Sequence, residues 1–417
     1  MKKIPANREA WRRDSWRTFP VNQQPAYHDA SEVDEVLRDI GLSEGLVDIS
    51  SIRCLQASLE RLYSSNNSML IHAGDCAETF ISCIDARITR DTNFISSLPF
   101  SVRVGRMCGQ FAKPRSNDLE HHSQLGAIPV FRGDIINCLD PRDREPCPFR
   151  MKKALEVSRA MYDTVRSQSS DVYISHECLL LPYEESLVRD CSSSGNPFLS
   201  SAHFVWIGDR TRAPGGAHIE FCRGIENPIG IKVGPTSDPR EIRECIITLD
   251  PLNRPGKVTV ITRYGAGNVG QHLPALIREL EGLNILYQCD PMHGNTIVVN
   301  GSMKTRLVNS IEAEIAEVVS VHKAMGSRLH GLHLEATGSD VTECVGVNVG
   351  IDDLAKRYES ACDPRLNPTQ TRHVVDFMYS LLGDNDEVKL FPCLSPESRL
   401  TTADTSRCGS SSSDAES

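Results

Sequence analysis

The sequence contains no run of about 20 apolar residues of the kind that forms a membrane-spanning helix. It also lacks an excess of basic residues, because 45 Lys and Arg residues face 55 Asp and Glu residues, and the formal net charge is -10. A general nucleic-acid-binding protein usually needs a basic surface to meet the phosphates. We therefore expect neither a membrane nor a nucleic-acid partner, although local groups of cations can still bind small anions.

No Cys-x-x-Cys pair occurs among the 15 cysteines, and their odd number does not suggest a complete disulfide framework. Reduced thiols are therefore expected. The N-terminal region carries Arg12, Arg13 and Arg17, but no apolar segment follows them, so it does not resemble a secretory signal. These features favour a cytoplasmic protein.

The composition favours one large domain with two appendages. Residues 393–417 include a serine run at 410–413 and few large apolar side chains, which is typical of a disordered tail. An α/β barrel commonly fills more than two hundred residues as a single domain. We expect an N-terminal extension over residues 1–60, a catalytic domain over residues 61–392 and the tail over residues 393–417.

Short β-branched runs alternate with amphipathic stretches, a pattern typical of parallel strands joined by crossover helices. Helical spacing is found at 240–248, 273–281 and, most clearly, 310–325. The eight runs that we expect to form strands are 68–73, 101–104, 172–175, 203–207, 228–233, 258–262, 284–288 and 329–334. Eight such units predict an α/β fold, a closed (β/α)8 TIM barrel, whose active site gathers the residues that follow the strands.

One seven-residue run, CDPMHGN at 289–295, directly follows the apolar stretch 283–287. An acid, Asp290, and a residue of metal-binding type, His293, thus leave a predicted strand together. Because α/β enzymes hold their reactive groups at the carboxyl ends of buried strands, we expect this run to contribute to an active site.

Four cations lie at or just after successive predicted strands: Arg106, Arg210, Lys232 and Arg263. In one cavity they would repel one another unless a multiply charged anion lay among them, and guanidinium groups match phosphate and carboxylate groups. A substrate that carries both groups fits this pattern. The alternative is that these residues are solvated and paired with acids at the rim.

A second basic cluster, Lys113-Pro114-Arg115-Ser116, follows the second predicted strand by a short loop. Pro114 would stiffen the loop, and the cluster would then hold a second phosphate. Taken alone, the same residues also fit an ordinary charged surface turn.

Soft and hard metal-ligand types occur together at the strand ends and beyond the last strand: Cys76, His293, Glu335 and Asp363. One thiolate, one imidazole and two carboxylates suit Mn, Fe, Co or Zn. A single buried Cys or His is more often a core residue than a ligand. The metal prediction therefore depends on a barrel that brings these strand ends together.

The chain resembles the class II 3-deoxy-D-arabino-heptulosonate 7-phosphate (DAHP) synthases. The similarity extends from about residue 15 to the helix that follows residue 367, with the motifs in the order of that family. The motifs that carry it are GDCAETF at 74–80, VGR at 104–106, QFAKPRS at 110–116, WIGDRTR at 206–212, CDPMHGN at 289–295 and DPRLN at 363–367.

The resemblance implies a metal-dependent transferase that condenses phosphoenolpyruvate with erythrose 4-phosphate and releases phosphate, the first step toward shikimate and the aromatic amino acids. It implies a divalent metal, Mn2+ first and Co2+ or other divalent ions second, and a homodimer or homotetramer. A specialised secondary-metabolite pathway is a second setting for the same reaction.

The resemblance also implies roles for residues at matching motif positions. The metal ligands would be Cys76, His293, Glu335 and Asp363. Phosphoenolpyruvate would bind Arg106, Asp209, Arg210, Lys232 and Arg263, and the sugar phosphate would bind Lys113, Arg115 and Ser116. Catalytic roles would fall to Lys232, Arg263, Asp209 and His293. Asp209 departs from the family, which usually has Glu there.

Two segments, at 80–102 and 137–171, are shorter than in typical members, and the second is where larger relatives insert helices tied to feedback control. We therefore expect weak inhibition by aromatic amino acids. The shorter first crossover could instead damage the barrel. Two other hypotheses are a metal-dependent hydrolase, which the absence of His-x-His at the first strand disfavours, and a catalytically weak homologue that serves as a partner or regulatory subunit.

Overall fold

The computed structural model describes residues 10–169, 171–191, 196–299, 301 and 303–383. The segment expected to form a disordered tail, residues 393–417, lies outside the described residues. Among the helices that the structure describes, none is both long and apolar enough to cross a membrane.

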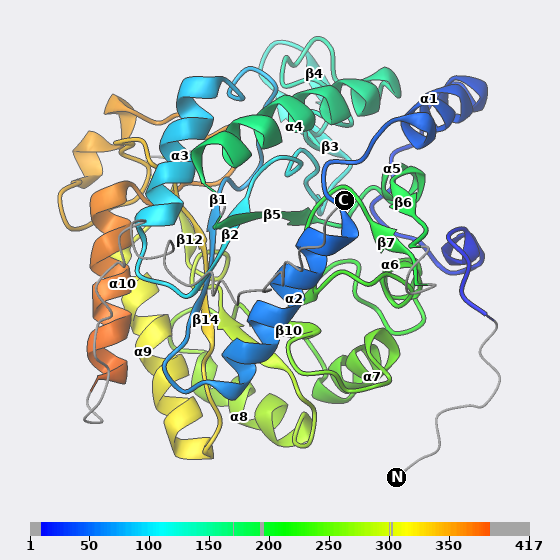
Figure 1. Cartoon of the computed structure of the whole chain (residues 1–417). Helices are drawn as coiled ribbons and strands as arrows, with labels where there is room; N and C mark the ends of the chain where they lie inside the picture. The colour runs from blue at the N-terminus through cyan, green and yellow to red at the C-terminus, as the bar shows by residue number, and fades with distance from the viewer. Residues whose placement is uncertain (1–9, 170, 192–195, 300, 302, 384–417) are drawn as a thin grey trace, which may run out of the picture.

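Eight parallel strands close into a barrel, which confirms the predicted (β/α)8 architecture (Figure 1). Around the barrel the strands follow the order β1-β14-β11-β10-β9-β8-β5-β2. Their bounds are β1 Leu70–Gly74, β2 Val102–Arg106, β5 Val172–Glu177, β8 Phe204–Ile207, β9 Ile229–Val233, β10 Val258–Thr262, β11 Leu286–Cys289 and β14 Gly331–Glu335. Each overlaps one predicted run. In the register, Gly74 lies beside both Arg106 and Glu335, so the carboxyl ends of neighbouring strands meet at one face.

Helices surround the barrel, and α9 and α10 pack side by side on its outside (Figure 1). In α9 the apolar spacing predicted from the sequence forms the buried face, and the helix ends at Gly326 with φ 64°. The first crossover carries a helix, α3, and β1 pairs with β2, so the shortening that we expect in this segment has not damaged the barrel. The helix bounds are α3 Asp85–Ser97, α4 Phe149–Gln168, α5 Leu181–Ser186, α6 Ala217–Cys222, α7 Pro239–Leu249, α8 Val269–Glu279, α9 Val308–Met325 and α10 Pro368–Leu382.

The amino-terminal mouth of the barrel is closed by α2 (Ile49–Ser64). Its buried residues Leu55, Leu59 and Leu62 form one apolar cluster with side chains at the starts of the strands, among them Leu70 and Leu286. This burial fixes the helix against the barrel, because apolar area removed from water stabilises the packing. The boundary that we propose at residue 60 falls inside α2, and we therefore count this helix with the barrel. Before it lie η1 (Ser15–Thr18) and α1 (Ala30–Leu42).

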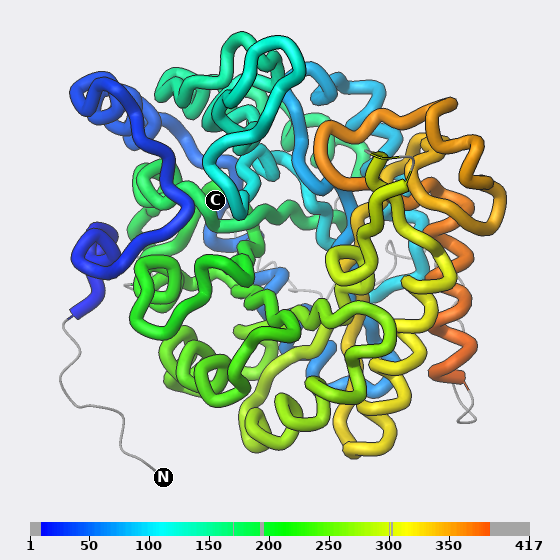
Figure 2. The backbone as a smooth tube through the Cα atoms, turned by 180° about the vertical axis from the view of Figure 1, so that it is seen from behind, coloured from blue at the N-terminus to red at the C-terminus, as the bar shows by residue number. Residues whose placement is uncertain are grey.

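Antiparallel hairpins follow three of the barrel strands, and the sequence analysis did not predict them (Figure 2). Those after β2 and β11 matter for function, because residues of both line the large cavity described below. The hairpins are β3 (Leu119–His122) with β4 (Gly126–Pro129), β6 (Val188–Arg189) with β7 (Phe198–Leu199), and β12 (Thr296–Val299) with β13 (Met303–Arg306). A 3-10 helix, η2 (Ile351–Lys356), lies between β14 and α10.

Candidate active site

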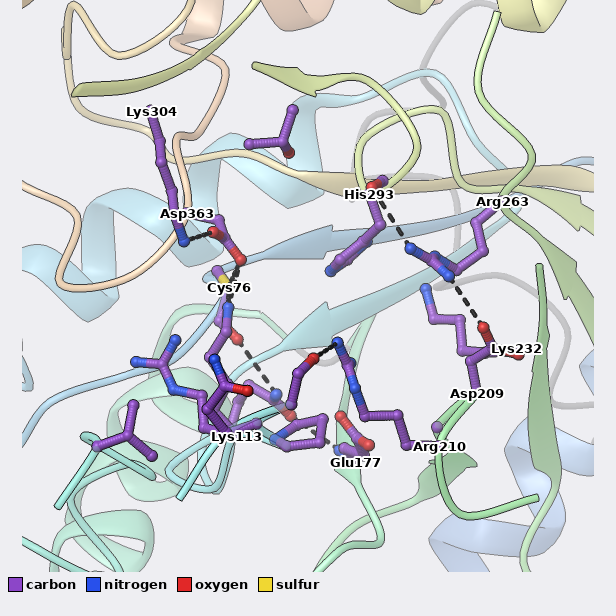
Figure 3. Close-up of a pocket in the computed structure, with 18 of the residues that line it drawn as sticks. Cys76, Lys113, Glu177, Asp209, Arg210, Lys232, Arg263, His293, Lys304 and Asp363 are labelled. Atoms are coloured by element: carbon purple, nitrogen blue, oxygen red, sulfur yellow. Dashed lines mark hydrogen bonds and ion pairs between the residues drawn. The ribbon is translucent and has the colours of Figure 1, made fainter. Parts of the chain in front are cut away.

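A cavity of about 520 Å³ opens at the carboxyl ends of the barrel strands (Figure 3). Eleven of the twelve residues predicted to form a site line it: Cys76, Arg106, Lys113, Arg115, Ser116, Asp209, Arg210, Lys232, Arg263, His293 and Asp363. The twelfth, Glu335, is fully buried and lies within 3.0 Å of His293 Nε2. The barrel thus brings together residues that are up to 287 positions apart in the sequence. The chemical roles of these residues remain predictions.

Three of the predicted metal ligands form a tight group. The ligand atoms of Cys76, Glu335 and Asp363 all lie within 4.8 Å of one another. Cys76 follows β1 and Glu335 ends the neighbouring β14, while a bridge between Ala336 and Leu366 brings the Asp363 loop beside them. A thiol with two carboxylates is a donor set that suits a divalent transition metal.

His293 lies at the edge of this group and not within it. Its Nε2 atom is 3.0 Å from Glu335 Oε1, and its Nδ1 atom is 2.7 Å from Asp290 Oδ2. Both ring nitrogens thus contact a carboxylate, and a metal ion at the acidic group would take the place of the contact between Nε2 and Glu335 while Asp290 kept the proton on Nδ1. A carboxylate behind an imidazole in this way is the usual support of a metal-binding histidine.

Two lysines contact Asp363, and one of them, Lys113, is a residue predicted for the sugar phosphate. Lys113 Nζ contacts both Cys76 Sγ and Asp363 Oδ2, and Lys304 Nζ lies 2.8 Å from Asp363 Oδ1 (Figure 3). Burial alone would raise the pKa of Asp363, but the charge and hydrogen bond of Lys113, together with the hydrogen bond from Lys304, hold that pKa well below its usual range. Burial and Glu335 raise the pKa of Cys76, so a thiolate there needs a neighbouring cation.

The four predicted substrate cations differ in their surroundings. Arg106 is 2% exposed, lies 3.1 Å from Glu335 and stacks on Trp206 at 5.0 Å. Lys232 is also buried and forms an ion pair with Asp290. The alternative interpretation is that the cations are solvated residues paired with acids at the rim. Arg106 and Lys232 are paired with acids, but they are buried and not solvated.

Asp209 joins two arginines at the wall of the cavity. Its Oδ2 atom is 3.0 Å from Arg263 Nη1, and its Oδ1 atom is 2.9 Å from Arg212 Nε. The carboxylate therefore holds Arg263 in place over the cavity (Figure 3). Gly234 lies so close that a Cβ there would meet Asp209 Oδ2 at 2.8 Å, so a larger residue would displace this carboxylate.

Arg210 and Ser116 meet across the cavity. Arg210 Nη2 donates to Ser116 Oγ at 2.8 Å, which joins a residue predicted for phosphoenolpyruvate to one predicted for the sugar phosphate. The neighbouring Arg115 is fixed at both its backbone and its side chain, because its amide donates to Gln23 Oε1 at 2.8 Å and its Nε donates to the Phe131 carbonyl at 2.6 Å. Arg115, Ser116 and Arg210 therefore offer polar groups to one region of the cavity.

Sequence reasoning missed several charged residues of the site. Lys304 and Arg306 come from the unpredicted β12–β13 hairpin, and Arg306 lies 2.7 Å from Glu335 Oε2. Glu177 lines the cavity from the end of β5. Its place at the carboxyl end of a predicted strand is the signal that could have identified it. Burial raises the pKa of Glu177, although the cations around it, Lys232 first, act in the opposite direction.

Comparisons with known proteins relate most of the chain to one family. The model of the class-II DAHP synthetase family matches residues 11–171 and 165–378. A phospho-2-dehydro-3-deoxyheptonate aldolase of Neurospora crassa is 35% identical over 447 aligned positions, which cover 87% of this chain and 92% of that protein. The enzyme of the same name from Streptomyces coelicolor is 34% identical over 427 positions, with 86% and 94% covered.

A third relative, from Mycolicibacterium smegmatis and also named phospho-2-dehydro-3-deoxyheptonate aldolase, is 32% identical over 449 positions that cover 89% of this chain and 95% of that protein. Among solved structures, a phospho-2-dehydro-3-deoxyheptonate aldolase from Francisella tularensis superposes with a TM-score of 0.52 at 15% identity, covering 84% of this chain and 95% of that one. At that identity the structural similarity supports the fold alone.

Proposed function

The chain belongs to the class-II DAHP synthetase family, and on that premise we propose that it is a phospho-2-dehydro-3-deoxyheptonate aldolase. It would join phosphoenolpyruvate to erythrose 4-phosphate and water, and release DAHP and phosphate. The observation that carries the proposal is one cavity in which Arg and Lys side chains suited to phosphate lie beside a Cys, Glu and Asp group. Neither the family match nor the named relatives support a catalytically silent subunit.

Phosphoenolpyruvate carries a phosphate and a carboxylate, and the proposed site offers matching cations. Lys232 and Arg263 reach the cavity from β9 and from the end of β10, and Arg106 lies at its floor. Asp209 would act by orienting Arg263, to which it is bonded at 3.0 Å. The shorter acid at this position keeps that ion pair, which supports activity despite the departure from the usual Glu.

Erythrose 4-phosphate would bind with its phosphate near Arg115, Ser116 and Arg210. Ser116 Oγ and Arg210 Nη2 already lie 2.8 Å apart, so both could meet one phosphate. Lys113 would join them only after leaving Cys76 and Asp363, which it now contacts. Holding two anions together is costly unless cations neutralise them, so these residues would supply both orientation and charge compensation.

The donor set fits a divalent metal, with Cys76, Glu335 and Asp363 as ligands and His293 as the fourth. Mn2+ is our first expectation, and Co2+ or another divalent ion is the second. Such an ion would supply a Lewis acid for the aldehyde oxygen of the sugar phosphate. Asp290 would keep the proton of His293 on Nδ1, so that Nε2 stays free to bind.

The reaction needs charge stabilisation more than covalent catalysis. The enol carbon of phosphoenolpyruvate attacks the aldehyde carbon, water adds to the cationic C2, and phosphate leaves from the resulting hemiketal phosphate by cleavage of its C–O bond. Lys232 and Arg263 would neutralise the departing phosphate. We place this step at the entry to the shikimate and aromatic amino acid pathway, in the cytoplasm, with a secondary-metabolite pathway as a second setting and a homo-oligomer as the working form.

Steady-state assays test the proposal directly. Phosphate release should require both substrates and a divalent ion, and addition of a chelator should abolish it. Release from either substrate alone at the same rate would contradict it.

A further inference from the structure

Five charged residues form a buried chain behind the proposed metal-ligand group. Glu343 lies 2.8 Å from Arg365, and Arg365 lies 2.6 Å from Asp75. The other oxygen of Asp75 lies 2.6 Å from Arg87, which approaches Asp91 at 3.5 Å. The signs alternate along the chain, and each side chain is at most 13% exposed.

The five charged residues belong to, or form hydrogen bonds with, the backbone segments that carry three proposed ligands. Asp75 directly precedes Cys76, and Arg365 lies two residues after Asp363. At the far end, Asp91 Oδ1 accepts from Thr337 Oγ1 at 2.9 Å and from the Gly338 amide at 2.6 Å, just beyond Glu335.

Glu343 fixes the loop that carries Asp363. It accepts hydrogen bonds from the backbone amides of Glu359, Ser360 and Arg365, at 2.9, 2.8 and 2.7 Å. The two ends of the segment around Asp363 are therefore held by one carboxylate that is fully buried.

None of the five residues lines the 520 Å³ cavity, so they cannot touch a substrate there. A thiolate and two carboxylates within 4.8 Å of one another repel. Lys113 offsets part of this repulsion from the cavity side, but it does not fix the backbone segments that carry the three residues. Buried ion pairs contribute little net stability, but they can fix one geometry.

We propose that these five ion-paired residues, with Asp75 at their centre, position three metal ligands for a divalent cation. The ligands are Cys76, Asp363 and Glu335. The inference rests on the proposed function, because it takes these three residues as metal ligands. Asp75 matters most, since it joins both arginines and also adjoins Cys76.

The test is a titration of the purified full-length protein with Co2+ alone, followed by the near-ultraviolet absorption of a cobalt–thiolate bond. Asp75→Asn removes the charge between the two arginines at constant size. We expect its affinity for Co2+ to fall 10- to 100-fold, the range typical when a residue that supports a metal ligand is removed. We also expect the thiolate absorption to weaken, which a merely structural role would not cause.

Asp250→Asn is the matched control, because Asp250 is also buried and pairs with Arg254 at 2.8 Å, but at the end of α7. It should keep the wild-type affinity and spectrum. If Asp75→Asn does not fold, Asp91→Ala is the second variant, because it removes the bonds behind Glu335 and the contact with Arg87 but leaves Asp75 in place. It should weaken Co2+ binding and retain the thiolate absorption.

Wild-type affinity and absorption in either folded variant would overturn the positioning role and leave the proposed function intact. A wild-type protein without any cobalt–thiolate absorption would overturn the metal site itself, and this inference with it.

Discussion

The ammonium group of Lys113 contacts both the thiol of Cys76 and a carboxylate oxygen of Asp363. A divalent ion that binds these two residues therefore has to displace a lysine. The same lysine begins the loop that contains Arg115 and Ser116, so its displacement would move a positive charge toward the proposed sugar-phosphate region. On the proposed function, metal binding and sugar-phosphate binding would thereby be linked through one side chain.

Replacing Lys113 by Met should strengthen the binding of Mn2+ and weaken that of erythrose 4-phosphate. We expect about a tenfold gain in metal affinity, which corresponds to ~1.4 kcal/mol for the lost competition. Isothermal calorimetry with Mn2+ measures it, and the KM for erythrose 4-phosphate should rise. Lys304→Met is the informative comparison, because Lys304 contacts Asp363 but not Cys76. Unchanged or weaker metal binding in Lys113→Met would show that the lysine does not compete.

Removing the charge of Arg263 or Lys232 should cripple turnover. Each would forfeit a charge-assisted hydrogen bond to the substrate phosphate or carboxylate, worth roughly 1.5–3 kcal/mol, so kcat/KM for phosphoenolpyruvate should fall about 10- to 100-fold or more. Kinetics of Arg263→Ala and Lys232→Ala provide the measurement. Arg254→Ala, which alters an arginine paired with Asp250 away from the cavity, should remain active. Near-normal activity in the first two variants would refute their assignment.

The activity should decline in alkaline solution because of Lys232. Burial lowers the pKa of Lys232 to about 8, although the neighbouring Asp290 acts in the opposite direction. The charged form, which binds the anion, is present below that pH and is lost as the pH rises through it. The pH profile of kcat/KM for phosphoenolpyruvate should therefore fall above about pH 8. Lys232→Arg should lose this limb, and a wild-type profile that stays flat to high pH would exclude Lys232 as the binding cation.

Aromatic amino acids should inhibit this protein weakly. Two of the relatives align over 447 and 449 positions, more than the 417 residues of the whole chain, so they contain residues that have no counterpart here. The segments that we expect to be shortened lie between Phe80 and Val102 and between Asn137 and Asp171. Titration with phenylalanine, tyrosine and tryptophan, singly and in pairs, should leave the rate nearly unchanged. Strong inhibition by any of them would disprove this view.

The sequence predicts the barrel and most of the cavity well, because both follow from local pattern. Eight β-branched runs separated by helices determine a parallel barrel, and that topology alone brings Cys76, Lys232 and His293 to one face. The motif resemblance added the expected reaction and the roles of individual residues.

The remaining parts of the site depend on contacts between distant residues, which no local pattern encodes. The β12–β13 hairpin is short and partly exposed, so its sequence does not stand out, yet it brings Lys304 to Asp363 and Arg306 to Glu335. The pairing of Asp75 with Arg365 spans 290 positions. Such pairings are specified only when the loops are packed together.

The most direct test of the central claim is the fate of oxygen during the reaction. Both substrates and Mn2+ should be incubated with the protein in water enriched in oxygen-18, and the released phosphate analysed by mass spectrometry. Because the proposed reaction breaks the C–O bond of the hemiketal phosphate, we expect unlabelled phosphate that forms only when both substrates are present. Phosphate that carries one atom of oxygen-18, or that forms from phosphoenolpyruvate alone, would indicate hydrolysis at phosphorus and contradict the account.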